Sequence, residues 1–481
     1  MILISQEPQS PFDQAYGPNP VTITGMPVDP VTGIPQADKY VLQVLVNGEI
    51  IADIRQSPNQ SGVAIFDIQN TLQNFVSPSK DNIEETGLIG ADLANSAFES
   101  VAYVLRASTE TSGVVPAYPG DPGEWDTSDV LLDFGGKKEY FQVPYSNSQY
   151  IPVLGTSPAA GCTTVFAPAN VFTERFTGRR AIDISNAGEG IPAFISSATT
   201  TVIEQNVTVD DMTTTSFFNG VSGTGPTLAQ GIEAFVIYQY NGAVLLSTDI
   251  IYNTQGLGGG PQTATGQGVI PTYPYVGITA GTGPKNLTDF AGTLVTHYYV
   301  MAQPYTDGAC PTGIPSIADA SMFTPMRFNI VDAACNDFPA FQFSWLNRFG
   351  FRDYYSFNKR NDRSVAIKRN TYLKEAADYA SSSYNVEVYN RGTTVFSQAL
   401  QENFTAFTDF ISDEDAIYLE SLFISPDVKV RFNEKPGAGK YEWVPVSLLS
   451  TSYTQKTSRK DNLFQYDIKF KRAHNLKSQR G

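Results

Sequence analysis

The stretch that decides the fold runs from residue 40 to residue 76. It begins Tyr40-Val-Leu-Gln-Val-Leu-Val-Asn47-Gly48-Glu-Ile-Ile-Ala-Asp-Ile-Arg55, two β-type runs on either side of an Asn-Gly pair. Asn and Gly tolerate the positive φ that both central positions of a type I′ turn require, and the twist of that turn suits a hairpin. The sequence therefore predicts a β-hairpin, and no residue in it suggests chemistry.

The rest of this stretch predicts a compact β-module with a short helix. A loop at residues 58–62 contains proline and glycine, and a short strand follows it. Asp67 can cap a helix of one to two turns. The apolar face of that helix is expected to be Ile68, Leu72 and Phe75.

Strands with the same period of two are expected farther along the chain. Residues 234–252 form a second strand, Asn-Gly, strand unit around Asn241 and Gly242, which either a duplicated module or coincidence explains. The side chains expected on the buried faces of two other strands are Val101, Tyr103 and Leu105, and Tyr466, Ile468 and Phe470.

The best helix pattern lies near the C-terminus, over residues 412–423. Ser412 is placed to cap it, acidic residues fill its first turn, and Pro426 stops it. Strands are expected on its C-terminal side, which makes this part a small α+β domain. The predicted apolar face of the helix is Ala416, Leu419, Leu422 and Phe423.

The fold class predicted from these patterns is mainly β and multi-domain, with β-sandwich-like modules and a C-terminal α+β domain. A chain of 481 residues is long enough for about three domains. The predicted parts are a Pro-rich extended arm (1–38), a β-module with a short helix (39–107), a loop-rich insertion (108–195), a second β-module (196–335) and the α+β domain with a basic tail (336–481).

The composition favours a protein whose surface is covered by partners. Charged residues make up 17% of the chain, below the roughly 25% of soluble domains. Tyrosine and phenylalanine are numerous, at 25 and 30 residues. Charge depletion and aromatic enrichment mark the cores of interfaces. A β-rich monomer with a Ser, Thr and Asn surface is the alternative.

The net charge of −16 is unevenly distributed. Residues 1–340 hold 11 Lys and Arg against 32 Asp and Glu, whereas residues 341–481 hold 21 against 16. This pattern suits docking of one copy's C-terminal region on an acidic neighbour. It argues against sequence-specific nucleic-acid binding, which needs clustered cations. The acidity suits either a wall along which DNA slides without sticking or simple solubility.

The chain offers little material for catalysis. Its two histidines, His297 and His474, stand in no metal-binding or triad motif, and the glycine-rich run 256–268 lacks the Lys-Ser/Thr of a phosphate-binding loop. Three cysteines, without Cys-x-x-Cys spacing, exclude a disulfide framework and leave open a bridge between Cys310 and Cys335. We expect no enzyme activity, no cofactor and no metal. No signal peptide and no membrane span are expected either.

A loop with acids and aromatics is the one place that suggests sugar chemistry. Glu124 and Asp126 flank Trp125, and Asp129 follows; paired carboxylates of this kind cleave glycosidic bonds. Near pairs also arise by chance among 48 acidic residues. Binding of a glycan without cleavage is the alternative, and its candidate residues are Tyr118, Trp125 and Tyr150.

Four segments carry a resemblance to a known group of proteins. The order of strand, Asn-Gly, strand, Arg-Gln-x-Pro-Asn and Phe-Asp-Ile in residues 40–76 resembles virion proteins of tailed phages that infect Bacteroidetes, the crAss-like group among them. Similar blocks are Phe343–Phe357, which contains Trp345-Leu-Asn347-Arg348-Phe349-Gly350, then Ser425–Val428 and the closing Ala473–Gly481. Together they cover about a third of the chain.

The resemblance implies a structural subunit of a phage particle, in the tail or the portal-proximal neck. It implies assembly in the reducing host cytoplasm, with identical copies in a ring and with other tail or portal-proximal proteins as partners. Arg348 and Asp353 are expected to pair across a turn that Gly350 allows. The interface candidates are Trp345, Asn347, Arg348, Phe349, Asp353, Trp443, Arg472, Lys477 and Arg480.

Overall fold

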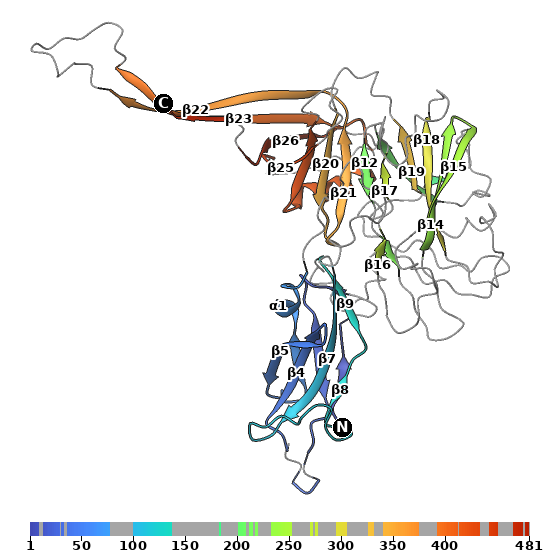
Figure 1. Cartoon of the computed structure of the whole chain (residues 1–481), viewed down its shortest axis with the longest axis vertical. Helices are drawn as coiled ribbons and strands as arrows, with labels where there is room; N and C mark the ends of the chain where they lie inside the picture. Colours follow the sequence, from blue (N-terminus) through green and yellow to red (C-terminus); the bar gives the residue numbers. More distant parts are fainter. Residues whose placement is uncertain are drawn as a thin grey trace, which may run out of the picture. The chain divides into compact units, whose positions relative to one another are not determined.

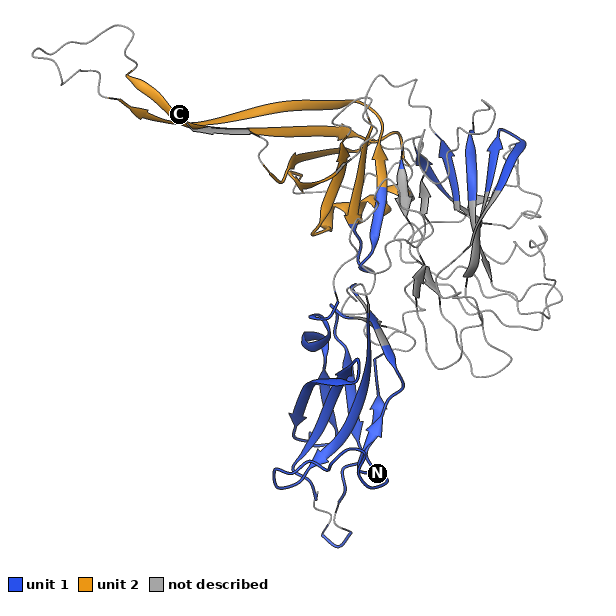
Figure 2. Cartoon of the chain, in the orientation of Figure 1, with its two compact units in different colours: residues 1–331, 346–354 blue, residues 332–345, 355–481 orange. Residues whose placement is uncertain are grey.

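The computed structural model confirms a mainly β, multi-domain chain (Figure 1). It forms two compact units, which are described separately (Figure 2). Unit 1 comprises Met1–Val331 and Leu346–Tyr354, and unit 2 comprises Asp332–Trp345 and Tyr355–Gly481. The structure describes residues 1–8, 13–28, 30–32, 36–76, 100–136, 182–183, 201–207, 211–214, 217–219, 232–252, 270–272, 275–277, 295–304, 326–330, 340–374, 392–411, 413–432, 442–450, 465–474 and 477–480.

Unit 1 begins with a β-sandwich built from two sheets that share one core. The core combines residues of both sheets, among them Ile23, Phe66, Leu42 and Leu105. The first sheet has the order β1 (Leu3–Gln6), β3 (Pro20–Thr24), β6 (Ala64–Asp67). The second has the order β2 (Asp13–Gln14), β9 (Leu131–Phe134), β7 (Ser100–Glu110), β4 (Lys39–Val46), β5 (Glu49–Gln56), and β8 (Asp126–Thr127) pairs with β7.

The decisive stretch folds as expected, except that Ile68 rather than Asp67 is the N-cap of the short helix and that Phe75 is not buried. Asn47 and Gly48 have φ of 53° and 83° and connect β4 to β5, which confirms the hairpin. The Asp67 carboxylate accepts a hydrogen bond from the Gln69 amide at the start of α1 (Gln69–Leu72). Ile68 and Leu72 are fully buried. Phe75 is 40% exposed, because the helix ends before it and the chain turns away.

The prediction that residues 1–38 form an extended arm is wrong for the residues described. β3 lies between β1 and β6, where Val21 and Ile23 enter the core. Pro20 stands at the first position of β3, which a proline tolerates. The hydroxyl of buried Tyr40 accepts a hydrogen bond from the Met26 amide at 2.9 Å, and so fastens the segment after β3. The many prolines of this segment predict an extended arm, although β3 alternates between buried and half-buried side chains.

The predicted boundary at residue 107 is also wrong. β7 continues to Glu110, and β9 pairs with both β7 and β2, so the sandwich extends through residue 134. The buried face of β7 is the one expected, Val101, Tyr103 and Leu105. The turns between these strands predict a separate insertion, but β8 and β9 pair with β7 and complete this sheet.

The middle of unit 1 contains a six-stranded sheet and two small pairs of antiparallel strands. Asn241 ends a strand, and the turn consists of Gly242 and Ala243, with φ of 53° at Gly242. The second Asn-Gly pair is therefore shifted by one residue from the first. The sheet order is β10 (Ile182–Asp183), β11 (Thr201–Val207), β19 (Met326–Ile330), β18 (His297–Pro304), β14 (Ile232–Asn241), β15 (Val244–Tyr252). The pairings are β12 (Met212–Thr214) with β17 (Tyr275–Gly277) and β13 (Phe217–Asn219) with β16 (Ile270–Thr272).

The C-terminal part is an α+β domain, as predicted. Helix α4 (Asp413–Ile424) buries Ala416, Leu419 and Leu422 against the sheet, and Tyr466, Ile468 and Phe470 meet them in one core. Ser412, its expected cap, lies outside the described residues. The sheet order is β21 (Arg352–Phe357), β20 (Phe341–Leu346), β24 (Val428–Phe432), β25 (Glu442–Leu448), β26 (Asp467–Arg472), β23 (Thr393–Phe407), β22 (Asn361–Leu373), and β27 (Lys477–Arg480) pairs with β23.

Candidate functional site

Two strands of the C-terminal sheet are much longer than the core needs. β22 and β23 have 13 and 15 residues and pair with each other along the whole of β22. Beyond their base they leave β26 and run outward together, with β27 paired to residues 397–400 of β23 (Figure 1). We call residues 361–374 and 393–402 the ribbon. Nearly every residue of β22 is exposed.

The ribbon is fixed to the core by a buried carboxylate. Glu402 is 6% exposed and forms ion pairs with Arg363 of β22 and, at 3.3 Å, with Arg472 of β26. The Arg472 guanidinium also lies 4.2 Å from the ring centre of Phe432. Arg472 is therefore a structural residue at the ribbon's base, although it had been an interface candidate. No local sequence pattern marks Glu402, because its two partners are 39 and 70 residues away along the chain.

The ribbon presents apolar and cationic side chains to solvent. Lys368, Arg369 and Lys374 are exposed and make no ion pair among the described residues. Among the described residues, 393–396 pair with β22 alone. A two-stranded hairpin is marginally stable in water, so this outer part of the ribbon is suited to binding a partner. Its exposed large apolar residues are Val365, Ile367, Tyr372, Leu373, Val395 and Phe396, between 37% and 81% exposed.

Most interface candidates in the Phe343–Phe357 block are interior residues. Trp345 is fully buried, and its indole nitrogen donates a hydrogen bond to Ser421 at 2.8 Å. Phe349 and Asp353 are at most 1% exposed. A neighbouring subunit therefore cannot reach these side chains without opening the fold. The sequence pattern marked them as anchors, and the structure uses them as anchors within one chain.

Asn347, another interface candidate, organises the turn after β20. Its side-chain oxygen accepts hydrogen bonds from the amides of Phe349 and Phe351, and its side-chain nitrogen donates to Asp353 at 3.0 Å. This role belongs to an asparagine, which both accepts and donates. Arg348 lies over the Phe349 ring at 4.9 Å. A pair between Arg348 and Asp353 stays a prediction.

The same turn packs closely on the sandwich. Gly350 has φ of 89°, and a Cβ added to it would lie 2.3 Å from the carbonyl carbon of Gly135. The expected tight reversal is confirmed, and the close approach of two backbones adds a second reason for glycine. The side chain of Gln205 donates to the Tyr354 carbonyl at 3.0 Å, so the middle sheet also holds the end of this segment.

The remaining interface candidates lie on the last strands of the sheet. Trp443 is half-buried on β25, opposite Arg431 of β24, and so keeps an exposed portion. β27 begins at Lys477 and ends at Arg480. These two residues pair with Leu400 and Ser397 of β23. The backbone of this tail thereby supports the ribbon.

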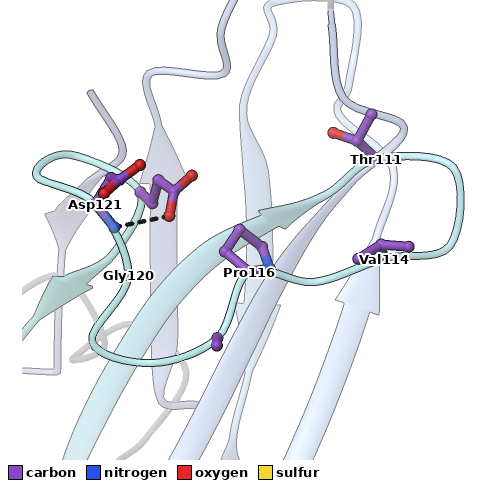
Figure 3. Close-up of a pocket in the computed structure, with 7 residues that line it drawn as sticks. Thr111, Val114, Pro116, Gly120 and Asp121 are labelled. Carbon is purple, nitrogen blue, oxygen red and sulfur yellow. Dashed lines mark hydrogen bonds between the residues drawn. The ribbon is translucent and has the colours of Figure 1, made fainter.

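The rings of the glycan candidates Tyr118 and Trp125 contact each other. The loop that carries them also lines an open pocket of about 500 Å³, and Figure 3 shows the residues around it. Their ring centres are 5.7 Å apart, and the Arg106 guanidinium lies 3.6 Å from the ring centre of Tyr118. Tyr118 is 46% exposed. Tyr150 lies outside the described residues. The pocket is lined by Thr111, Val114, Pro116, Ala117, Gly120, Asp121 and Glu124.

The carboxylates near this pocket are engaged in holding the loop. Glu124 accepts a hydrogen bond from the Asp121 amide at 2.9 Å, and Asp126 accepts one from the Ile4 amide at 2.7 Å. Burial raises the pKa of Glu7, and the nearby charges of Asp129 and Asp126 raise it further. These carboxylates form a negative surface, which we call the acidic loop surface: residues 111–130 with Glu7.

His297 is built into the middle sheet. It is 2% exposed, its ring stacks on Tyr240 at 5.3 Å, and its Nδ1 lies 3.2 Å from the Thr296 hydroxyl. Burial raises the pKa of Tyr240, which keeps the phenol neutral. Within the described ranges, no three His, Cys, Asp or Glu side chains gather as a metal site requires. Cys162, Cys310 and Cys335 lie outside those ranges.

Comparison with known protein families and with curated proteins finds no match for this chain. In the part of the chain that the structure describes, no helix has the length and hydropathy needed to cross a membrane.

Gly350→Ala should destabilise the protein more than an alanine at another glycine of positive φ. Gly113 is the matched control, because its φ is 81° and a Cβ there would meet nothing within 4 Å. We expect Gly113→Ala to lower the free energy of unfolding by about 1 kcal/mol. Gly350→Ala should cost about 3 kcal/mol, since the backbone at Gly350 must also move away from the backbone at Gly135. Urea unfolding followed by circular dichroism measures both; equal losses would contradict the close approach.

Glu402→Gln should loosen the base of the ribbon. Arg472 would lose the carboxylate that offsets its burial, and we expect a loss of about 2–3 kcal/mol in the free energy of unfolding, reduced from the value for a fully buried pair because Arg363 is exposed.

Asp362→Asn is the control for Glu402→Gln. Asp362 and Arg360 form an exposed pair, with side chains 51% and 68% exposed. This change should cost no more than about 0.5 kcal/mol. Urea unfolding of both variants and amide hydrogen exchange along residues 361–373 provide the measurement. Similar small effects for both variants would show that Glu402 does not fasten the ribbon.

Proposed function

We propose that this chain is a structural subunit of a tailed-phage particle, located in the tail or the neck. It joins identical copies into a ring or other symmetric assembly and contacts other tail or portal-proximal proteins. No reaction is assigned to it. Its acidic N-terminal part suits a wall past which DNA moves without sticking.

The observation that carries the proposal is the ribbon. It is a long, exposed extension of a sheet with no core of its own, and it presents apolar side chains to solvent. Contiguous exposed apolar surface is typical of interaction sites. The resemblance of residues 40–76 and 343–357 to phage virion proteins supports the particle as the setting.

Immunoelectron microscopy of purified particles tests the location. An antibody against the sandwich of residues 1–76 should label the tail or neck, in several copies per particle. An antibody against the major capsid protein is the control for labelling elsewhere. Label confined to the capsid, or particles that lack the chain, would refute the proposal.

A second candidate function is binding of a host surface glycan at the tail periphery. Tyr118 and Trp125 beside a pocket with carboxylates favour it, since aromatic faces and hydrogen-bond acceptors together recognise sugars. The Arg106 guanidinium lies over the Tyr118 ring and leaves less of that ring for a sugar. The structural role is therefore the first proposal.

Trp125→Ala tests the glycan function. Binding to immobilised capsule or outer-membrane polysaccharide, measured by biolayer interferometry, should fall at least tenfold, on the order of 1.4 kcal/mol. Tyr372→Ala, which removes an exposed aromatic of the ribbon, should leave glycan binding unchanged. Absence of binding by the wild-type chain would exclude this function, and release of reducing ends would indicate an enzyme that degrades capsule.

A further inference from the structure

The ribbon and the acidic loop surface are complementary in charge and in apolar character. The ribbon carries Lys368, Arg369 and Lys374 next to exposed apolar residues. Asp121 and Asp129 are exposed on the acidic loop surface, and Glu124 is half-buried there. The exposed large apolar side chains of that surface are Val114, Tyr118 and Val130, 46–68% exposed.

We propose that the ribbon of one copy docks on the acidic loop surface of a second copy of this chain. The inference rests on the proposed function, which calls for repeated contacts between identical subunits. The pocket beside Val114 and Glu124 offers a recess for an apolar side chain near the ribbon's end, where Leu373 is 81% exposed.

A contact of this kind is compatible with a ring. The two surfaces are different parts of the chain, so the contact is heterologous and each copy can give a ribbon and receive one. Contacts of this type close into rings when the rotation between neighbours permits, and otherwise form filaments. A symmetric pair of ribbons would instead stop at a dimer and would bring like charges together.

The interaction should depend on salt. Exposed ion pairs are screened within about 8 Å at physiological ionic strength, and complementary charges mainly speed and orient association. Sedimentation velocity at 50 mM and 500 mM NaCl should therefore show weaker association of the wild-type chain at the higher concentration.

Charge reversal in trans is the decisive experiment. The ribbon variant carries Lys368→Glu, Arg369→Glu and Lys374→Glu, and the surface variant carries Asp121→Lys and Asp129→Lys, both exposed acids. Each variant alone should associate at least tenfold more weakly than the wild-type chain in sedimentation velocity. An equimolar mixture should regain association, because every ribbon then finds a surface of opposite charge. Failure of the mixture to regain it would overturn the inference.

Matched controls separate the contact from total charge and from folding. Lys469→Glu changes an exposed lysine of β26, and Glu49→Lys changes an exposed acid at the β4–β5 hairpin; neither should alter association. Circular dichroism should show an unchanged fold in every variant. Loss of association in the controls equal to that in the variants would show a general charge effect and refute the specific contact.

Cross-linking distinguishes contacts between copies from contacts within one. A photoreactive amino acid at position 368 is placed in a mixture of isotopically light and heavy chains. Peptides from residues 111–130 should appear cross-linked between light and heavy copies. Cross-links only within one copy, a monomer at all concentrations, or binding of the ribbon to duplex DNA or anionic vesicles without self-association would each overturn the inference. The immunolabelling result is independent of these, so particle location and this contact can fail separately.

Discussion

The buried carboxylate of Glu402 is the interaction on which the C-terminal unit depends. It lies where the ribbon leaves the core, between Arg363 on the ribbon and Arg472 on β26. On the core side, Phe404 and Ala406 continue β23 into the packed interior. On the solvent side, nearly every residue of β22 is exposed. A polar clamp at this point lets one strand belong to the core and to a projecting surface.

Polar side chains of unit 1 fix backbone that apolar packing alone would leave undetermined. Asn347 closes the turn after β20, Tyr40 fastens the segment after β3, and Asp67 receives the amide of Gln69. Each lies where a strand ends and the chain changes direction. Buried hydrogen bonds are directional, so they select one path among several that would bury similar apolar area.

Rigid internal packing together with exposed apolar surface supports the proposed role in contacts between subunits. Among the described residues, most aromatic side chains are buried, as with Trp345, Phe343 and Phe470. They make the domain stiff, because aromatic rings pack with defined geometry. Within the described residues, the ribbon and the acidic loop surface are two places where charged and apolar side chains are exposed together.

The sequence by itself determined the local elements. Three local patterns extend over only a few residues each: the period-two runs, Asn47-Gly48 and the helix pattern of residues 412–423. The β class, the first hairpin and the α+β end follow from them. Tertiary structure alone decided that Val21 and Ile23 pair into a sandwich, that Gly350 meets Gly135, that Trp345 is interior, and that β22 projects. Each of these depends on partners far along the chain, and no local period encodes them. The ribbon was missed for the same reason: its exposed strand has mixed polar and apolar residues on both faces, so no buried face marks it.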